Sequence, residues 1–292
     1  MDPVTRRPHS LEDVAVSFDF DGVLARSPFG RGVLYPALRE IARSVSDRTG
    51  APWDREESRL RGLAMEEFRG RTARGDYVQA YDWQAIVEKV AREDGEIFEG
   101  SLARRTDEFA LGIGRSADRS LVYPDALEAL RKLKERGAFL LLLTNGFREF
   151  QLPMVRAFGM EPCFDAILAA DDLGTVKPFP EAFEKAFRSC AHLRVGRRYH
   201  VGDTLIHDVL GARDSGIFAV WIDRDLPEEL ARLGRGERMK SGRLDEVLRE
   251  KLARENEAHG VAGSGRPGEE QVRPDAVIAG LGELEGVIDG AP

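Results

Sequence analysis

The chain has 292 residues, enough for one large domain or two modest ones with a substantial hydrophobic core. Its 43 Lys and Arg against 51 Asp and Glu give a net charge of −8, which argues against a general nucleic-acid binder. The longest apolar run, Ala138 to Leu143, is far shorter than the roughly 20 residues that a membrane-spanning helix needs. We therefore expect a globular protein that engages neither nucleic acid nor a membrane.

Targeting and redox signals agree with this expectation. Residues 1–11 contain arginines with no apolar segment behind them, unlike a secretory signal. The two cysteines, Cys163 and Cys190, form no CxxC pair, so neither a zinc site nor a disulfide framework is expected. Together these features predict a cytoplasmic protein.

Short apolar runs predict the strands of a sheet, and three of the first four end in a polar cluster. In chain order they cover Val14–Phe20, Ala138–Leu143, Tyr199–Gly202, Ile217–Ile222 and Asp275–Gly280. Their apolar residues are continuous rather than alternating, which is typical of a parallel sheet covered on both faces. Helices are predicted between and after them, at Pro124–Arg136, Pro180–Cys190, Leu205–Ser215 and Leu281–Ile288. This alternation favours a doubly wound α/β fold built from right-handed βαβ units.

Residues 27–121 interrupt the alternation. Their patterns predict helices and no strand, at Val33–Arg48, Asp54–Arg74, Tyr81–Arg92 and Ile97–Leu111. The stretch is long enough to be a helical unit inserted into the α/β core. Glycines flank three arginines in Arg69–Gly75, which predicts that the second of these helices ends in a loop there.

A second interruption, rich in Glu and Arg, covers residues 224–271. Leu244, Val247, Leu248 and Leu252 predict one amphipathic helix in it, and we expect the charged residues to face solvent. Gly260–Gly268 is typical of a flexible linker. The predicted division of the chain is therefore a first core strand at 1–26, the helical insertion at 27–121, the rest of the core at 122–223, the charged insertion at 224–271, and a closing strand and helix at 272–292.

Carboxylates gather where two of the predicted strands end. Asp19 and Asp21 close the first strand, and residues two apart at a strand end can share a face. Asp203 and Asp208 follow the third strand, at the start of a helix. In such folds the strand ends share one crevice, where close carboxylates are tolerated only with a cation or a shared proton. Mg²⁺ prefers oxygen ligands of this kind.

Lys177, which precedes a proline, and Thr144-Asn145 at another strand end extend this set of polar groups. A lysine and Mg²⁺ can neutralise a phosphoryl group, so that a carboxylate can attack the phosphorus. Hydroxyl and backbone donors can hold the phosphoryl oxygens, and a second carboxyl group can protonate the leaving alkoxide and later activate water. The set therefore predicts phosphoryl-transfer chemistry.

Four segments, in this order, resemble the motifs of the haloacid dehalogenase superfamily: Asp19-Phe20-Asp21-Gly22-Val23, Thr144-Asn145-Gly146, Lys177-Pro178 and Gly202-Asp203-Thr204-Leu205-Ile206-His207-Asp208. The resemblance covers residues 14–223 and also 272–290. The insertion at 27–121 resembles the all-helical cap domain of the phosphatase members. The resemblance thus implies a Rossmann-like α/β core with an inserted helical cap. His207 departs from the pattern, since this subgroup often carries Asn there.

The resemblance also implies a role for each motif residue. Asp19 would be the nucleophile that forms an aspartyl-phosphate, and Asp21 would be the general acid and base. Lys177 would bridge the nucleophile and the phosphoryl group. Thr144 and Asn145 would bind the phosphoryl oxygens. The ligands of Mg²⁺ would be Asp19, the main-chain carbonyl of Asp21, and Asp203. Asp208 would either be a further ligand or contact one of the ligands without binding the ion itself.

The implied activity is Mg²⁺-dependent hydrolysis of a small phosphorylated metabolite. A phosphosugar mutase shares every core motif and stays open as an alternative. A 2-haloacid dehalogenase would need neither Mg²⁺ nor Asp21. A phosphonate hydrolase would need a cap lysine for a Schiff base, and the cap region has only Lys89, which lies well within a predicted helix. A non-catalytic binding module would be expected to lack a motif aspartate or lysine, and none is missing. In the predicted cap, Arg71 and Arg74 are candidates for holding a second anionic group of the substrate. Alternatively, they complement the C-terminus of their helix and the acidic surface.

Overall fold

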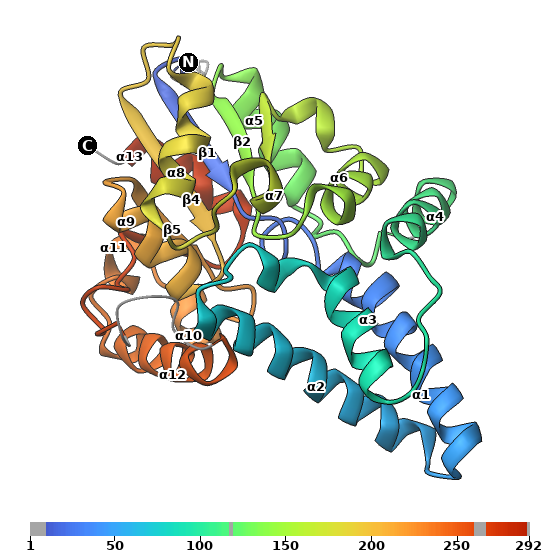
Figure 1. Ribbon diagram of the computed structural model, residues 1–292. Helices are drawn as coiled ribbons and strands as arrows, with labels where there is room; N and C mark the ends of the chain where they lie inside the picture. The colour runs from blue at the N-terminus through green and yellow to red at the C-terminus, as the bar shows by residue number, and fades with distance from the viewer. Residues whose placement is uncertain (1–9, 117–118, 260–266, 291–292) are drawn as a thin grey trace, which may run out of the picture.

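The computed structural model describes residues 10–116, 119–259 and 267–290. Within them, six parallel strands form one sheet in the order β3-β2-β1-β4-β5-β6. The chain builds outward from β1, first on one side and then on the other, so the strand order reverses between β1 and β4. Open α/β sheets bind ligands in the crevice at such a reversal. The strands are β1 Val14–Phe18, β2 Phe139–Leu143, β3 Ala166–Leu168, β4 Arg197–Gly202, β5 Phe218–Ile222 and β6 Ala276–Ile278 (Figure 1).

The helices fall into two groups. Those of the helical cap follow β1 in the sequence and lie beyond the strand ends in Figure 1. They are η1 Gly30–Leu34, α1 Tyr35–Thr49, α2 Trp53–Arg74, η2 Gln79–Tyr81, α3 Trp83–Glu93 and α4 Leu102–Arg115. The core helices are α5 Ala126–Glu135, α6 Arg148–Ala157, η3 Glu161–Cys163, α7 Ala170–Leu173, α8 Pro180–Phe187, η4 Arg188–Cys190, η5 Leu205–Leu210, α9 Gly211–Asp214, α10 Glu228–Ala231, α11 Arg235–Arg238, α12 Gly242–His259, η6 Leu281–Glu283 and α13 Leu284–Gly290.

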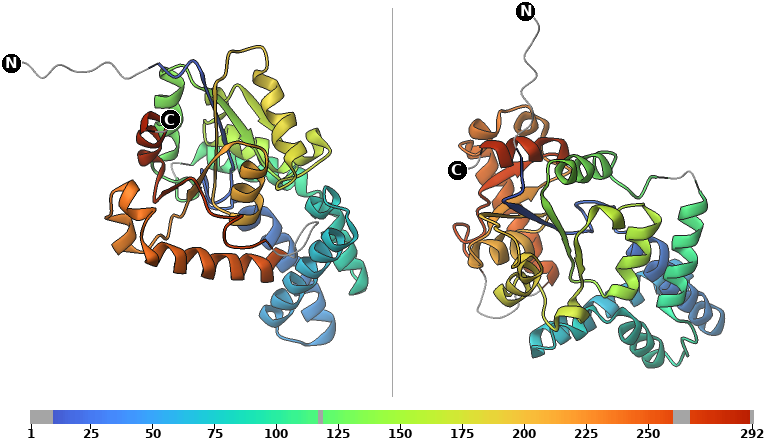
Figure 2. Two further views of the ribbon diagram at one scale, coloured as in Figure 1. Left: turned by 90° about the vertical axis from the view of Figure 1, so that its left-hand side faces the viewer. Right: turned by 90° about the horizontal axis from the view of Figure 1, so that it is seen from above.

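The sheet is buried on both faces, as its continuous apolar strands predict. Along β1, Val14, Val16 and Phe18 belong to one hydrophobic cluster, whereas Ala15 belongs to another. The first cluster includes the buried faces of α5, α6 and α13, and the second those of α8, η5, α9 and α12. Figure 2 shows helices on both sides of the sheet. The predicted doubly wound α/β core with an inserted helical cap is therefore confirmed.

The helical cap has its own packing and a short connection to the core. Helix α1 packs against α2, which also contacts α3. Phe68 of α2 stacks on Trp83 with ring centroids 5.8 Å apart and meets the Tyr81 ring edge-on. Ala25 and Val122 pair in an antiparallel bridge, so the two chain segments that join the cap to the core run side by side.

Sequence patterns predict every described strand except β3 and every long helix except α6. Strand β3 has three residues, too few for a periodic pattern. Helix α6 contains Pro153, which removes a backbone donor and normally marks a helix end. Helix α4 begins at Leu102 rather than Ile97, because Ser101 accepts the Arg104 N–H as its N-cap.

Two predictions about charged segments are wrong. Helix α2 continues to Arg74, and Gly75 ends it in the left-handed conformation (φ 85°), so Arg69–Gly75 is not a loop. In the 224–271 segment, Arg238 and Glu255 are buried rather than solvated, because each finds polar partners inside the protein. The predicted linker Gly260–Gly268 lies largely outside the described residues.

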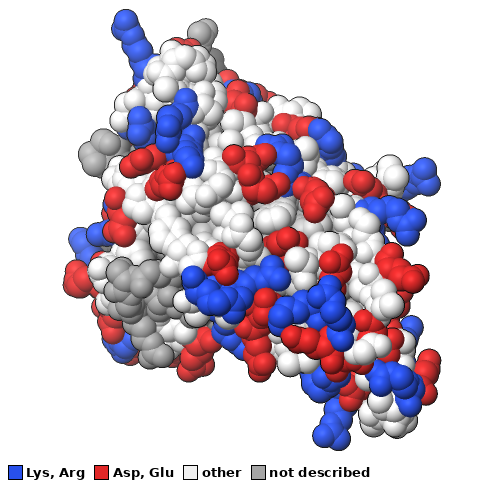
Figure 3. All heavy atoms as spheres, in the orientation of Figure 1, with Lys and Arg blue, Asp and Glu red and all other residues white. Residues whose placement is uncertain are grey.

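The surface carries charges of both signs. On the face shown in Figure 3, basic and acidic side chains are interspersed over the core and the helical cap. Many of them form ion pairs, such as Arg59 of α2 with Glu56 and Asp94. Exposed pairs of this kind contribute little to stability individually. No helix in the described ranges is both long and apolar enough to cross a bilayer.

Arg238 connects the charged segment to the sheet. Its side chain is 1% exposed. The guanidinium donates to the carbonyls of Leu230 and Ala231 and to that of Val277 in β6, and it lies 2.8 Å from a Glu283 carboxylate oxygen. Helices α10 and α11 are therefore fixed to the last strand through one side chain.

We expect Arg238→Ala to lower the free energy of unfolding by about 3 kcal/mol or more, because several buried carbonyls lose their donor at once. Arg232→Ala, which breaks only an exposed pair with Glu228, is the matched control and should cost less than about 0.5 kcal/mol. Urea denaturation followed by circular dichroism measures both values. Equal small losses would show that Arg238 does not hold the segment in place.

Candidate active site

A cavity of about 820 Å³ is lined by residues of both the core and the helical cap. The core contributes residues that follow β1, β2, β3, β4 and β5, which are consecutive neighbours in the sheet in the order β3-β2-β1-β4-β5, and the cap contributes residues of η1, α1, α2, η2 and the start of α3. Parallel strands direct their carboxyl ends to one edge of the sheet, so the polar clusters after these strands meet. The cavity lining includes every predicted core-motif residue: Asp19, Asp21, Thr144, Asn145, Lys177, Asp203 and Asp208.

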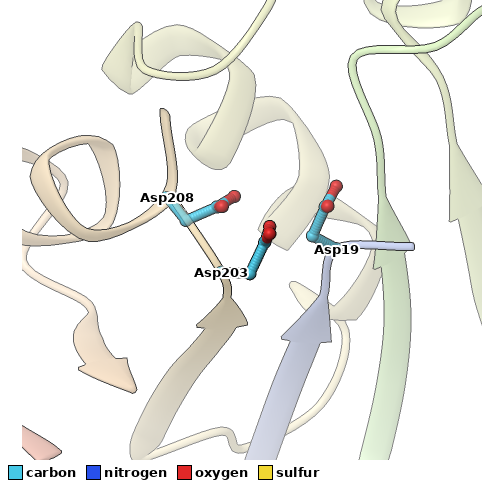
Figure 4. A group of neighbouring side chains, drawn as sticks. All are labelled: Asp19, Asp203 and Asp208. Atoms are coloured by element: carbon cyan, nitrogen blue, oxygen red, sulfur yellow. The ribbon is translucent and has the colours of Figure 1, made fainter. Parts of the chain in front are cut away.

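Three carboxylates converge in this cavity. Asp19, Asp203 and Asp208 each offer an oxygen within 4.8 Å of the others. Asp19 and Asp203 lie directly beyond the ends of β1 and β4, and Asp208 approaches from η5 (Figure 4). Lys177 Nζ lies 2.7 Å from Asp19 Oδ1 and 2.6 Å from Asp208 Oδ1. One buried ammonium group therefore pairs with two of the three carboxylates.

The protein satisfies both oxygens of Asp208. Oδ1 accepts a hydrogen bond from Lys177 and lies 3.0 Å from His200 Nε2, while Oδ2 accepts from the backbone N–H and the hydroxyl of Thr204. Burial opposes ionisation, yet the Lys177 charge and the His200 hydrogen bond hold the pKa of Asp208 well below its usual range. Because both oxygens already have partners, this arrangement favours the second predicted role of Asp208, in which it supports the metal ligands without binding the ion itself.

Asp203 is in the opposite situation. Burial raises the pKa of Asp203 well above its usual range, the charges of Asp208 and Asp19 raise it further, and no hydrogen bond from the described residues supports the anion. The carboxylate also lies against the Gly22 backbone, where a Cβ atom would come within 2.2 Å of Asp203 Oδ2. A buried carboxylate beside other anions needs a cation to stay ionised. The donor set therefore fits a hard divalent ion such as Mg²⁺.

Asp21 has one satisfied and one unsatisfied oxygen. Gln151 of α6 donates from Nε2 to Asp21 Oδ2 at 3.4 Å, whereas Oδ1 is buried without a partner in the described part of the chain. Burial first, and then the Asp19 charge, raise the pKa of Asp21 to about 7. A carboxyl group with this pKa can both release and accept a proton near neutral pH, as a general acid and base must.

Thr144 and Asn145 follow β2 but make different contacts. The Thr144 hydroxyl accepts from the Gly146 N–H at 3.1 Å and keeps its own proton to donate. The Asn145 side chain holds the Lys177 backbone from two sides, accepting its N–H at 2.8 Å and donating to its carbonyl at 2.9 Å. It also lies 3.0 Å from the Tyr81 hydroxyl of the cap. The Asn145 side chain therefore positions Lys177, and the phosphoryl contact that the resemblance implies for Asn145 stays a prediction.

Arg71 and Arg74 lie at the C-terminal end of α2 and are not among the described residues that line the cavity. Arg71 pairs with Glu67 at 2.8 Å, and Arg74 lies 3.5 Å from Asp76. These contacts match the alternative interpretation, in which the arginines complement the helix C-terminus and nearby acidic groups. A substrate contact by Arg71 or Arg74 stays a prediction, without support from their placement.

Two other cap arginines, Arg31 and Arg61, do line the cavity. Arg61 lies over the Tyr35 ring, 4.0 Å from its centroid, and its Nε is buried without a hydrogen-bond partner among the described residues. It pairs with Glu57, which also pairs with Arg39, so this group of one glutamate and two arginines keeps a net positive charge. The signal in the sequence was weak, because arginines recur along α2 and periodicity alone does not show which one faces the core.

The sequence patterns also missed the residues that support the motifs. His200 lies opposite Ser17 in the β1–β4 register, with its Nδ1 2.8 Å from the Ser17 hydroxyl and its Nε2 3.0 Å from Asp208 Oδ1. In the sequence, this pair could have been found only as two polar residues, each inside an otherwise apolar strand. Gln151 lies in helix α6, which no sequence pattern predicted, so its role at Asp21 could not be predicted either.

Gly22 and Gly75 provide a test of the cation site. Both have positive φ, 81° and 85°, so alanine at either position should strain the backbone by about 1–2 kcal/mol. A Cβ at Gly22 would meet the Asp203 carboxylate, whereas nothing lies within 4 Å at Gly75. We expect Gly22→Ala to weaken Mn²⁺ binding, measured by electron paramagnetic resonance, and Gly75→Ala to lower only the melting temperature. Unchanged Mn²⁺ affinity in folded Gly22→Ala would contradict this placement of the cation.

Comparison with known proteins agrees with this geometry. The profile of a family described as haloacid dehalogenase-like hydrolase matches residues 14–216. A phosphoserine phosphatase from Thermus thermophilus is 36% identical over 131 residues, which cover 44% of this chain and 52% of that protein. A phosphoglycolate phosphatase from Caulobacter vibrioides is 27% identical over 224 residues, which cover 76% of this chain and 84% of that protein.

The matches to relatives differ in extent. The chain spans about half the length of the first curated relatives it matches, 52% of the phosphoserine phosphatase and 43% of a pyrophosphatase from Halalkalibacterium halodurans. The solved structure of a HAD phosphatase from Thermococcus onnurineus shares the fold, with a TM-score of 0.60 and 22% identity over 94% of this chain and 98% of that one. Because the family profile covers more than half of the chain, including the converging aspartates, this protein belongs to the haloacid dehalogenase-like hydrolases.

Proposed function

We propose that the chain is a Mg²⁺-dependent phosphatase that hydrolyses a small phosphorylated metabolite through an aspartyl-phosphate on Asp19. The charge balance of the site carries this proposal. Asp19, Asp203 and Asp208 bring three negative charges against the single positive charge of Lys177, which leaves two uncompensated. That deficit equals the charge of one divalent cation. The names of the relatives, phosphoserine and phosphoglycolate phosphatases, support the same reaction class.

The chain's own groups would arrange the phosphoryl group. Asp19, Asp203 and the main-chain carbonyl of Asp21 would hold Mg²⁺, which when bound neutralises phosphoryl oxygens against an attacking anion. The Lys177 ammonium contacts Asp19 and would donate to a phosphoryl oxygen beside it. The Thr144 hydroxyl, whose proton is available, would donate to another.

The reaction would use the two carboxyl groups of the first motif in turn. An Asp19 oxygen attacks the phosphorus as the bond to the leaving alkoxide breaks, and the proton of Asp21 passes to that alkoxide. Asp21, now ionised, then takes a proton from water as the water oxygen attacks the aspartyl-phosphate and Asp19 departs as a carboxylate. A pKa of about 7 lets Asp21 serve in both directions.

Asp19→Asn keeps the side-chain size but removes the nucleophile, so we expect phosphate release to fall to background while the fold survives. Inorganic phosphate is measured with a panel of phosphomonoesters in Mg²⁺ and in EDTA, and circular dichroism verifies folding. Wild-type release should disappear in EDTA and return with Mg²⁺.

Each alternative function predicts a different outcome. Substantial turnover by folded Asp19→Asn would contradict the aspartyl-phosphate. Turnover of a haloacid in EDTA would support the dehalogenase, which needs neither Asp21 nor a cation at Asp203. Transfer of the phosphoryl group to another hydroxyl of a sugar, without phosphate release, would support the mutase.

The cap side of the cavity suggests the substrate class. Arg31 and Arg61 face the cavity that contains the core carboxylates, and no described group pairs with Arg31. Guanidinium groups bind carboxylates and phosphates through paired donors. We infer that the substrate carries a second anionic group besides its phosphoryl group, held by these two arginines.

Arg61→Ala should raise KM for an anionic phosphomonoester such as phosphoglycolate roughly tenfold, the effect of losing a contact of about 1.4 kcal/mol. KM for an aryl phosphate without a second anion should change little. Arg71→Ala and Arg74→Ala should leave both values unchanged. A larger effect of Arg71 or Arg74 than of Arg61 would restore the interpretation based on sequence. Equal losses on both substrates would indicate a damaged cap.

A further inference from the structure

Glu255 of α12 contacts the turn that carries the fourth motif. One of its carboxylate oxygens accepts the Leu205 N–H and the other accepts the Ile206 N–H, each at 2.9 Å. The residue is 6% exposed. These bonds join the 224–271 segment, which lies outside all four motifs, to the chain between Asp203 and Asp208.

The start of η5 needs this remote partner, because its local polar groups are used elsewhere. The first N–H groups of a helix have no partner within the helix, and an N-cap Ser, Thr or Asp usually accepts them. Here the N-cap is Thr204, which makes no such bond; its hydroxyl is directed to Asp208 instead. The preceding residue, Asp203, is the carboxylate assigned to the cation. Glu255 therefore supplies the acceptor and the negative charge that a helix N-terminus favours.

The packing of α12 holds Glu255 in place. Leu244, Leu248 and Leu252 are buried on the face of α12 that packs against the core, and Glu255 continues this stripe three residues after Leu252. Glu257, by contrast, is exposed. Burial raises the pKa of Glu255 to about 7, against the lowering effect of its two backbone hydrogen bonds. A carboxylate on the buried side of an otherwise apolar stripe would be costly without such partners.

We propose that Glu255 is a positioning residue for the cation site. By fixing the first turn of η5, it fixes the main chain on both sides of that turn and so the carboxylates of Asp203 and Asp208. On the β5 side, the Trp221 indole N–H donates to the Asp203 carbonyl at 2.9 Å, so Asp203 is held between two anchors. The 224–271 segment is thereby a structural part of the active site. The proposal rests on the proposed function only for the identity of the cation.

The test measures binding of Mn²⁺ alone by electron paramagnetic resonance, in the full chain and without substrate. Glu255→Ala leaves two buried N–H groups unpaired, and we expect the dissociation constant of Mn²⁺ to rise roughly ten- to a hundredfold. Glu255→Gln should have a smaller effect, because its amide oxygen can accept one N–H while its NH₂ group cannot accept the other. Glu257→Gln is the matched control on the exposed face of α12 and should bind Mn²⁺ as the wild type does.

Melting curves by circular dichroism separate positioning from stability, since binding is measured well below the lowest melting temperature. If Glu255→Ala does not fold, Glu255→Gln decides. Wild-type Mn²⁺ affinity in a folded Glu255 variant would overturn the proposal and leave the proposed function intact. A wild-type protein that binds Mn²⁺ but releases no phosphate would contradict the proposed function alone. A wild-type protein that binds no Mn²⁺ would overturn both.

Discussion

The buried ion pairs of Lys177 with Asp19 and Asp208 are the interaction on which the active site depends. Without the ammonium, three carboxylates within 4.8 Å of one another would repel in a low-dielectric site, and burial would protonate some of them. With it, Asp208 is a stable anion, and although burial opposes the charge of Lys177, the two aspartates keep its pKa above the usual range. Asn145 secures this arrangement by binding the Lys177 backbone at both its N–H and its carbonyl.

Two aspartates five residues apart acquire opposite properties from their surroundings. Asp208 has donors at both oxygens, whereas Asp203 has none among the described residues and lies against the Gly22 backbone. A second glycine permits this placement, because a Cβ at Gly202 would come within 2.1 Å of Asp208 Cγ. Asp208, whose oxygens both have donors, can hold the Lys177 ammonium, and Asp203, which has no donor among the described residues, can bind a metal cation. The same residue type thus serves two purposes because hydrogen bonding and burial differ over a few ångströms.

Segments outside the motifs complete the site from separate parts of the chain. The helical cap provides a wall of the cavity with Arg31 and Arg61 and reaches Asn145 through the Tyr81 hydroxyl. Helix α12 provides the acceptor for the first turn of η5, and Arg238 joins the neighbouring α11 to β6. The candidate catalytic groups follow strands β1 to β4, whereas some of the residues that hold them in place lie in the cap and in α12, far from those strands in the sequence.

The sequence by itself determined the core of the protein and predicted the candidate reactive residues. Continuous apolar strands followed by polar clusters imply a parallel sheet, and a parallel sheet brings those clusters to one edge, so Asp19, Thr144 and Asp203 could be placed together without coordinates. Lys177 follows β3, which no sequence pattern predicted, so only the family resemblance added it to this set. Only the tertiary structure decided which carboxylate lacks a donor, that Asn145 holds Lys177, and that Arg61 rather than Arg71 lines the cavity. It also placed Glu255, which reads as one more charge in a charged helix. These properties depend on contacts between residues 30 to 160 positions apart and on which side of a helix is buried, and no local pattern of polarity or periodicity encodes either.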